Sequence, residues 1–257
     1  MKDREWINIL NYEKKCRAGA CSRRENPSIL RRKQENINVL PEECKQAFFF
    51  SRPALQQSTQ STYSKKIILA SASPRRKKLL SKAGINFEIF ITNADEDISE
   101  PLPPHEFAME VALRKAVSAA SILISSKKPP DNIILSADTI VVIDGQVLGK
   151  PKDYNEAFSF LRLLSGRTHE VYTGFVIAVP HQNEYSFNNY FCKTDVIFNN
   201  LSDEQIDFYI NTNEPFDKAG GYGAQNYTDL LIDRIDGDYD NVVGLPVCMV
   251  LEKLRLF

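Results

Sequence analysis

The stretch Ile67–Gly84, IILASASPRRKKLLSKAG, decides the fold of this chain. Its first residues, Ile67–Ser71, form a short apolar run that predicts a buried β-strand. Ser73 then suits the N-cap of a helix, Pro74 its first turn and Gly84 its C-terminal end. A strand that passes through a tight turn into a helix is a building unit of α/β proteins, so we expect that fold class.

Four consecutive cations occupy the start of this helix: Arg75, Arg76, Lys77 and Lys78. The helix dipole disfavours positive charge at this end by roughly 0.3–1 kcal/mol for each exposed side chain. Free backbone N–H groups and cationic side chains at one helix start would together bind a polyanion. A solvated basic face is the alternative, and the sequence pattern leaves both interpretations open.

The rest of the chain continues the α/β pattern. The segments Val171–Val179 and Phe187–Phe198 alternate with a period of two, which predicts long antiparallel strands. An apolar stripe predicts a helix over His105–Ser125, and Ser202–Gln205 forms a capping box that opens another helix. The remaining predicted elements are strands at Phe87–Ile91, Asn132–Ala137 and Leu230–Arg234, an extended segment at Ile140–Ile143, and helices at Tyr154–Leu164 and about Leu245–Leu256.

Three features beside these elements are candidates for chemistry. Asp138 and Thr139 directly follow the strand predicted over Asn132–Ala137. A carboxylate in that place is desolvated unless it has cationic or metal partners, so we favour a functional role over an Asx turn. Lys115 falls beside the apolar stripe of its helix, where it either snorkels to solvent or points into a cleft. The glycine-rich stretch Asp217–Gln225 would let the backbone approach a ligand closely.

The first 66 residues differ in charge from the rest of the chain. Residues 1–66 hold 14 Lys or Arg against 7 Asp or Glu, whereas residues 67–257 hold 18 against 26. Because the basic segment lacks sustained periodicity, we expect a disordered N-terminal extension at 1–66 and one domain at 67–257. Basic clusters in the extension could touch nucleic acid, but a solvated tail is the favoured interpretation.

Motifs and hydropathy exclude several classes of protein. No apolar run approaches the roughly 18 residues of a membrane span, so no membrane-spanning segment is expected. No apolar core of a secretory signal follows the start of the chain, and we expect a cytoplasmic location. The chain lacks both the GxxxxGKS/T loop of P-loop nucleotidases and the HExxH zinc motif.

Eight short motifs follow one another along residues 67–257. They are LASASPRR at Leu69–Arg76, RKA at Arg114–Ala116, ADT at Ala137–Thr139, GKP at Gly149–Pro151, LSGRTH at Leu164–His169, DKAG at Asp217–Gly220, YGAQ at Tyr222–Gln225 and VVGLP at Val242–Pro246. In this order they resemble the Maf family of nucleoside triphosphate pyrophosphatases. The resemblance implies a mixed, strongly bent sheet flanked by helices, in two lobes with a nucleotide cleft between them, as in the related inosine triphosphate pyrophosphatases.

The resemblance also implies an activity and the residues that perform it. The family hydrolyses a nucleoside triphosphate between the α and β phosphates with a divalent cation, Mg²⁺ or Mn²⁺. By resemblance Asp138 is the base, and Glu96, in an acidic turn, assists it or the metal; both are predicted metal ligands. Lys115 and Lys150 complete the predicted catalytic set. The remaining cations and a hydroxyl donor are predicted to bind a substrate with about four negative charges: Ser71, Arg75, Arg76 and Lys218.

Within the family, the chain resembles the dTTP/UTP pyrophosphatase subgroup. It carries Arg75, Thr139 and Gln225, whereas a subgroup that prefers 7-methyl-GTP has a Trp in place of the arginine and another residue in place of the threonine. We expect Thr139 and Gln225 to help select the base, with modified pyrimidine nucleotides among the candidate substrates. The resemblance makes a homodimer an expected assembly and a house-cleaning role in the nucleotide pool the expected purpose. The alternative function is a nucleotide-binding regulator of cell division without significant catalysis; nucleic-acid binding is disfavoured.

Overall fold

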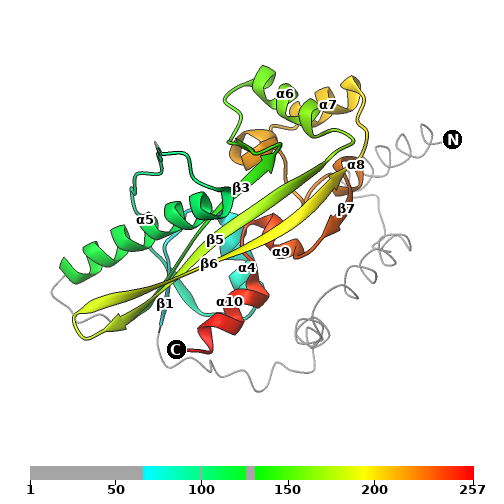
Figure 1. The fold of residues 1–257 in the computed structure, drawn as a ribbon. Helices are drawn as coiled ribbons and strands as arrows, with labels where there is room; N and C mark the ends of the chain where they lie inside the picture. The colour runs from blue at the N-terminus through cyan, green and yellow to red at the C-terminus, as the bar shows by residue number, and fades with distance from the viewer. Residues whose placement is uncertain (1–65, 99, 126–130) are drawn as a thin grey trace, which may run out of the picture. The chain divides into compact units, whose positions relative to one another are not determined.

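A seven-stranded mixed sheet organises the described part of the chain (Figure 1). The computed structural model describes residues 66–98, 100–125 and 131–257, which all belong to one compact unit, Gln46–Phe257. The predicted extension at 1–66 therefore lies outside the described residues, apart from Lys66. The strands are β1 (Ile67–Leu69), β2 (Phe87–Ile89), β3 (Ile133–Ile143), β4 (Gln146–Leu148), β5 (Thr168–His181), β6 (Glu184–Phe198) and β7 (Ile232–Asp236).

Parallel and antiparallel pairing meet at β3. The strand order is β2-β1-β3-β5-β6-β7, and β4 pairs with β3 outside this path. β1 runs parallel to both β2 and β3, whereas β4 and β5 run antiparallel to β3 and the later strands continue antiparallel. The parallel pairs need crossover connections, and the helices α4 (Pro74–Lys82) and α5 (Pro104–Ser125) supply them.

One edge of β3 is open in its middle. On this edge β1 pairs with Ile133–Leu135 and β4 pairs with Val141–Ile143, so no strand pairs with Ser136–Ile140 there. On the other edge β5 pairs with β3 continuously from Ile134 to Val142. The prediction that the strand ends at Ala137 was therefore wrong, because the β5 ladder carries β3 well past the end of β1.

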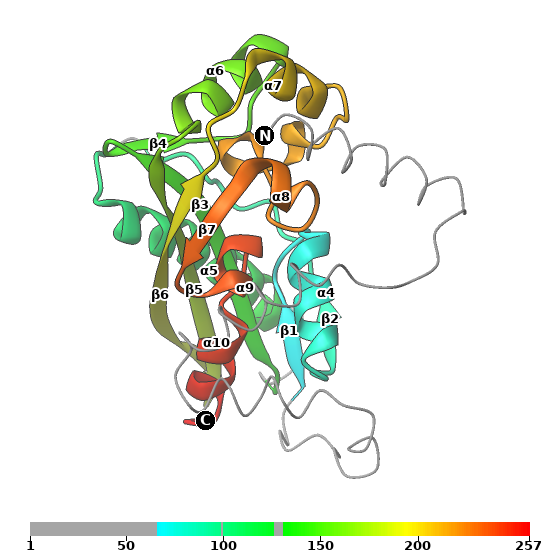
Figure 2. The same ribbon diagram turned by 90° about the vertical axis from the view of Figure 1, so that its right-hand side faces the viewer.

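Helices cover both faces of the sheet. In Figure 2, α9 (Tyr239–Val243) and α10 (Val247–Leu254) lie in front of β5, and α5 lies behind it. α5 rests on β3, β5 and β6 through fully buried small residues, among them Ala108, Ala112, Ala116 and Ala119. Small side chains allow a close approach, so that a Cβ built on Gly174 of β5 would lie 2.4 Å from the backbone of Ala108. The predicted mixed sheet flanked by helices is confirmed.

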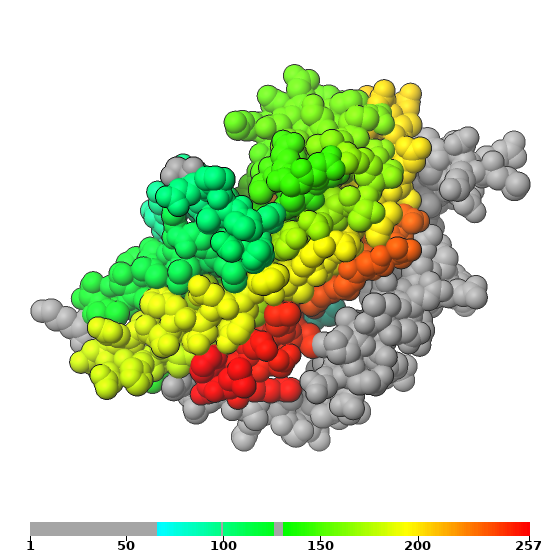
Figure 3. All heavy atoms as spheres, in the orientation of Figure 1, coloured from blue at the N-terminus to red at the C-terminus, as the bar shows by residue number. Residues whose placement is uncertain are grey.

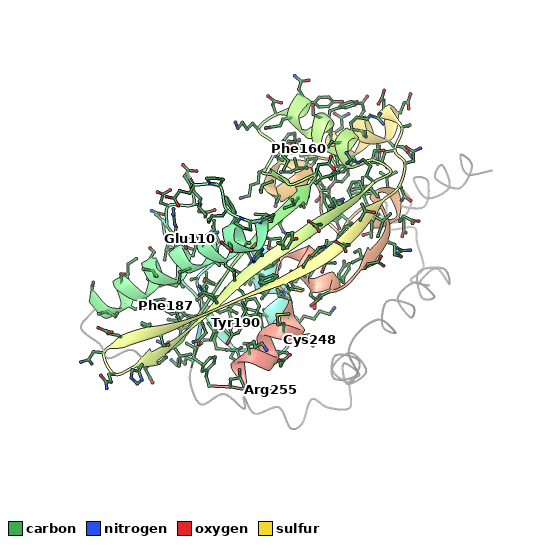
Figure 4. All side chains as sticks on the ribbon, viewed as in Figure 1. Glu110, Phe160, Phe187, Tyr190, Cys248 and Arg255 are labelled. Carbon is green, nitrogen blue, oxygen red and sulfur yellow. The ribbon has the colours of Figure 1, made fainter. Side chains whose placement is uncertain are left out.

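The predicted long antiparallel strands form one hairpin, β5–β6, which pairs from Thr168 opposite Ile197 to His181 opposite Glu184. Tyr190 of β6, labelled in Figure 4, stacks on Phe175 of β5 with ring centroids 5.2 Å apart. The surface view shows α10 beside the β6 side of this hairpin (Figure 3). At the end of the hairpin near Thr168, α6 (Tyr154–Leu164) packs against α7 (Asp203–Ile210).

Local signals fixed several element boundaries and missed others. The Ser73 side chain caps α4 by accepting a hydrogen bond from the Arg76 backbone, and the Ser202 capping box opens α7, both as predicted. Two short helices, α8 (Thr228–Leu231) and α9, were not predicted, and β7 begins at Ile232 because α8 occupies the residues before it. Within the described parts of the chain, no helix is long and apolar enough to cross a membrane.

Candidate functional site

Asp138 and Thr139 lie at the open edge of β3 and face opposite sides of the sheet. Successive side chains of a strand alternate between its two faces. The Asp138 side chain faces α5, as does Ser136, whose hydroxyl donates to the Ala112 carbonyl. Thr139 faces the other side, where its hydroxyl lies 2.9 Å from that of Thr173. Because no strand covers this edge, groups from both faces can approach one ligand there.

On the α5 face, one lysine bridges two carboxylates. Lys115 Nζ lies 2.7 Å from Asp138 Oδ1 and 3.1 Å from Glu96 Oε1. The lysine side chain is 13% exposed and that of Asp138 17%, whereas Glu96 is 60% exposed. Of the two interpretations of Lys115, the structure therefore supports the lysine that points at a site rather than one that snorkels to solvent. The structure brings together three of the predicted catalytic residues.

An arginine of α5 forms a hydrogen bond to the acidic turn that carries Glu96. Arg114 donates from Nη1 to the Asp97 carbonyl at 2.8 Å and from Nε to Glu110 Oε1 at 2.9 Å. Glu110 lies one helical turn earlier on α5 (Figure 4). In the sequence, Arg114 was indicated only as part of the RKA motif, although its i,i+4 spacing to Glu110 is typical of an ion pair.

On the opposite face, Arg76 is buried among neutral oxygens. Its guanidinium donates to Gly244 O at 2.8 Å, to Ser71 Oγ at 3.1 Å and to Thr139 Oγ1 at 3.1 Å. Burial lowers the pKa of Arg76, and the nearby negative charge of Asp138 opposes that shift. Among the described residues Arg76 forms no ion pair, so its charge is available to attract an anion.

Two supporting residues of this face were missed by the sequence analysis. Thr173 is fully buried and donates to the Asn241 carbonyl at 3.2 Å, which fixes the hydroxyl that meets Thr139. Gly244 ends α9 with φ 132°, a conformation that side chains rarely adopt, and so aims its carbonyl at Arg76. Gly244 belongs to the quoted VVGLP motif, but its contact to Arg76 spans 168 positions and leaves no local signal.

A third group of charges joins α4 to the glycine-rich segment. Arg75 Nη1 lies 2.6 Å from Asp217 Oδ2, and Lys218 Nζ lies 2.6 Å from Asp217 Oδ1. Burial alone would raise the pKa of Asp217, but hydrogen bonds from Lys218 and Arg75 outweigh it and hold that pKa below its usual range. Two predicted substrate-binding cations are therefore paired with a carboxylate that the sequence analysis did not single out.

Lys150 and Gln225 are exposed and make no hydrogen bond or ion pair within the described residues. Lys150 follows Gly149, whose carbonyl accepts a hydrogen bond from Gly220 N at 2.9 Å. This contact places Lys150 beside the glycine-rich segment. The structure does not bring Lys150 or Gln225 into contact with Asp138.

A buried histidine–tyrosine pair holds the glycine-rich segment to β5. His169 Nε2 lies 2.6 Å from the Tyr222 hydroxyl, and both side chains are buried. Burial lowers the pKa of His169 to about 3, so the imidazole is neutral at physiological pH. His169 belongs to the quoted LSGRTH motif. In the structure it supports the segment that carries Gln225, through its contact to Tyr222.

Comparisons with known proteins match almost the whole described region. A family model described as "Maf-like protein" matches residues 66–257. A Bacillus cereus protein named dTTP/UTP pyrophosphatase is 42% identical over 193 residues, which cover 75% of this chain and 96% of that protein. A protein of the same name from Bacillus cytotoxicus is 43% identical over the same shares of both chains. With this match and the order of the eight motifs, the chain belongs to the Maf family.

Proposed function

We propose that this chain hydrolyses dTTP and UTP to the nucleoside monophosphate and pyrophosphate. The names of the similar Bacillus proteins support this substrate pair. The structural observation that carries the proposal is the buried, unneutralised guanidinium of Arg76 next to the Asp138–Lys115 pair. A cation of this kind attracts phosphate, and a neighbouring carboxylate can activate water.

Phosphate binding would begin at the open edge of β3. Arg76 and the Ser71 hydroxyl offer donors on one face, and Lys115 offers positive charge on the other. Lys150 is exposed beside the glycine-rich segment and would add a further cation, whereas Arg75 and Lys218 are already paired with Asp217. These cations would neutralise part of the roughly four negative charges of a triphosphate, and a bound divalent cation would neutralise more.

In the chemical step, Asp138 would act as the general base. Its Oδ1 accepts from Lys115, and within the described residues no hydrogen bond reaches its Oδ2, which is free to take a proton from water. The water oxygen forms a bond to the α phosphorus, the bond to the bridging oxygen breaks, and pyrophosphate leaves. The proton ends on Asp138, and the adjacent cations stabilise the charge that develops on the phosphoryl oxygens.

Glu96 and Asp138 would hold Mg²⁺ or Mn²⁺ together with substrate oxygens. The two carboxylates converge on one ammonium within 3.1 Å, and Mg²⁺ sites of this class often use one or two carboxylates plus phosphates. No cluster of three or more ligating side chains occurs in the described ranges, which fits a site completed by the nucleotide. When bound, the metal would supply Lewis-acid stabilisation of the phosphates.

Base selection would fall to Thr139 and Gln225, supported by Arg75. The exposed Gln225 amide can both donate to and accept from a pyrimidine edge. Thr139 accepts a hydrogen bond from Arg76, so it would lie close to a nucleotide whose phosphates bind that arginine.

A substrate panel on the full chain tests the proposal. We expect pyrophosphate release from dTTP and UTP with Mg²⁺, and much less from GTP and 7-methyl-GTP. In ¹⁸O-labelled water the label should enter the monophosphate, since attack at the β phosphorus would label pyrophosphate instead. Nucleotide binding by calorimetry without any product would support the non-catalytic regulator and refute the enzyme.

A matched pair of variants tests the base. Asp138→Asn should lower kcat by roughly 100-fold or more with the fold intact. Asp144→Asn makes the same chemical change in a surface pair with Arg167 and should leave kcat unchanged. Full activity of Asp138→Asn would show that another group is the base.

A further inference from the structure

A continuous set of polar contacts joins the start of α4 to the residue beside Gln225. At its first end, Asp217 accepts from Arg75 twice, through Oδ2 at 2.6 Å and through its main-chain carbonyl at 3.1 Å. These two residues are 142 positions apart in the sequence, and Asp217 closes the 3₁₀ turn η2 (Pro215–Asp217). A two-point contact fixes the orientation of the guanidinium as well as its distance.

The next junction is Lys218. Its ammonium meets three oxygen acceptors: Asp217 Oδ1 at 2.6 Å, Glu214 Oε2 at 2.9 Å and the Glu214 carbonyl at 2.5 Å. An ammonium has three donors, so these contacts use all of them. Glu214 Oε1 then accepts from Asn226 Nδ2 at 2.9 Å, and Asn226 is the neighbour of Gln225. We call this set, Arg75–Asp217–Lys218–Glu214–Asn226, the strut.

Packing reinforces the strut at its centre. A Cβ built on Gly223 would lie 2.8 Å from Lys218 Cε and 2.9 Å from its Cδ, so the lysine stem lies against the backbone of Gly223. The Lys218 side chain is accordingly only 13% exposed. The glycine-rich segment therefore wraps around the lysine two residues before Gln225.

The strut remains charged at neutral pH. The hydrogen bond from Lys218 is the main cause that lowers the pKa of Glu214. The pKa of Asp217 is also lowered, because hydrogen bonds from Lys218 and Arg75 outweigh the effect of burial. Both carboxylates are therefore ionised wherever the enzyme would work.

We propose that Asp217 is a positioning residue that sets base selectivity by holding Gln225 at a fixed distance from the cations of α4. The inference rests on the proposed function, in which Arg76 attracts the phosphates and Gln225 reads the base. The base and the phosphates of one nucleotide are joined by a single ribose, so selectivity depends on the distance between their two contact points. Asp217 sets that distance because it is the strut residue that contacts both Arg75 of α4 and Lys218, the residue through which the strut continues to Asn226.

Selectivity of an isosteric variant tests the inference. In Asp217→Asn of the full chain, the ratio of kcat/KM for dTTP to kcat/KM for GTP should fall roughly fivefold or more. A residue needed only for stability would lower both values together and leave their ratio unchanged. Asp217→Glu keeps the charge and should restore part of the ratio, and Asp144→Asn, in a more exposed arginine–aspartate pair, should leave it at the wild-type value.

A second variant keeps the test decisive if Asp217→Asn does not fold. Asn226→Ala cuts the exposed end of the strut and should lower the same ratio. An unchanged ratio in the folded variants of an active chain overturns the inference alone. If the wild type prefers another triphosphate, the proposed function fails, and the ratio of that substrate to its runner-up still tests Asp217. A chain that hydrolyses no triphosphate overturns both.

Discussion

Replacing Gly174 with alanine tests the contact on which the α5 side of the site depends. Gly174 lies opposite Asp138 in the β3–β5 ladder, with the α5 backbone directly above it. An added Cβ would lie 2.4 Å from backbone atoms of Ala108 and Met109, whereas ordinary contact begins at 3.4 Å. Backbone atoms cannot relieve this clash by a change of rotamer, so the helix must move away from the sheet by about 1 Å.

That displacement has a cost in stability and in chemistry. Overpacking of this kind lowers the free energy of unfolding by about 1–3 kcal/mol. Lys115 lies on the same helix, two turns further on, and its stem is largely buried. A shift of about 1 Å would lengthen its 2.7 Å contact to Asp138 beyond hydrogen-bonding distance. Misplacement on this scale should lower kcat by roughly 10- to 100-fold.

Urea denaturation and steady-state kinetics on purified Gly174→Ala measure both effects. Gly149→Ala is the matched control, because a Cβ at Gly149 meets no atom within 4 Å. The control should unfold within about 0.5 kcal/mol of the wild type. A Gly174→Ala protein as stable as the wild type would refute the packing argument. Loss of stability with full kcat would refute the link between α5 and the chemistry.

Three further predictions concern other parts of the fold. His169 has a lowered pKa of about 3, so the unfolded chain binds its proton first as pH falls below 6.5. The contribution of His169 to stability is complete above pH 6.5 and is lost towards pH 3. Between pH 6.5 and 5, the free energy of unfolding measured by urea denaturation should therefore fall by about 2 kcal/mol more in the wild type than in His169→Gln. Thr173→Val removes two buried hydrogen bonds and should cost about 1–3 kcal/mol by the same method, and a loss below 0.5 kcal/mol would contradict that role. Ser202→Ala removes the cap of α7 and should cost about 1 kcal/mol with kcat unchanged; a fall in kcat would link α7 to the site.

The sequence predicted elements whose signals are local. An apolar run followed by an N-cap and a proline was enough for β1 and α4, and period-two alternation was enough for the β5–β6 hairpin. It predicted a strand at Asn132–Ala137 and a separate extended segment at Ile140–Ile143, but not that they form one strand, since the partner that joins them, β5, lies in a later segment of the chain. The short helix α9 was missed although Asp238 caps it locally, because its five residues are too few for a periodic pattern; a long-range bond from Thr194 Oγ1 to the Asp238 carbonyl adds to its stability.

The same contrast between local signals and long-range contacts applies to the candidate site. The SPRR motif indicated Arg75 and Arg76 together, and no local feature of the sequence predicts that their side chains have different partners. Neighbouring residues on a helix point about 100° apart, so Arg76 turns into the protein towards Thr139 while Arg75 reaches Asp217. Thr139 and Asp217 come from distant segments, and for that reason the sequence predicted the two cations but not the carboxylate that pairs with Arg75.

The central place of β3 in the sheet also has a consequence for movements of the strands on either side of it. Among the described strands, β3 alone joins the parallel group of β1 and β2, through β1, to the antiparallel group of β5, β6 and β7, through β5. If one of these groups of strands rocked against the other, β3 would be the axis of the movement. In a rotation, points on the axis are displaced less than points far from it. Asp138 and Thr139 therefore lie on the strand that such a movement would displace least.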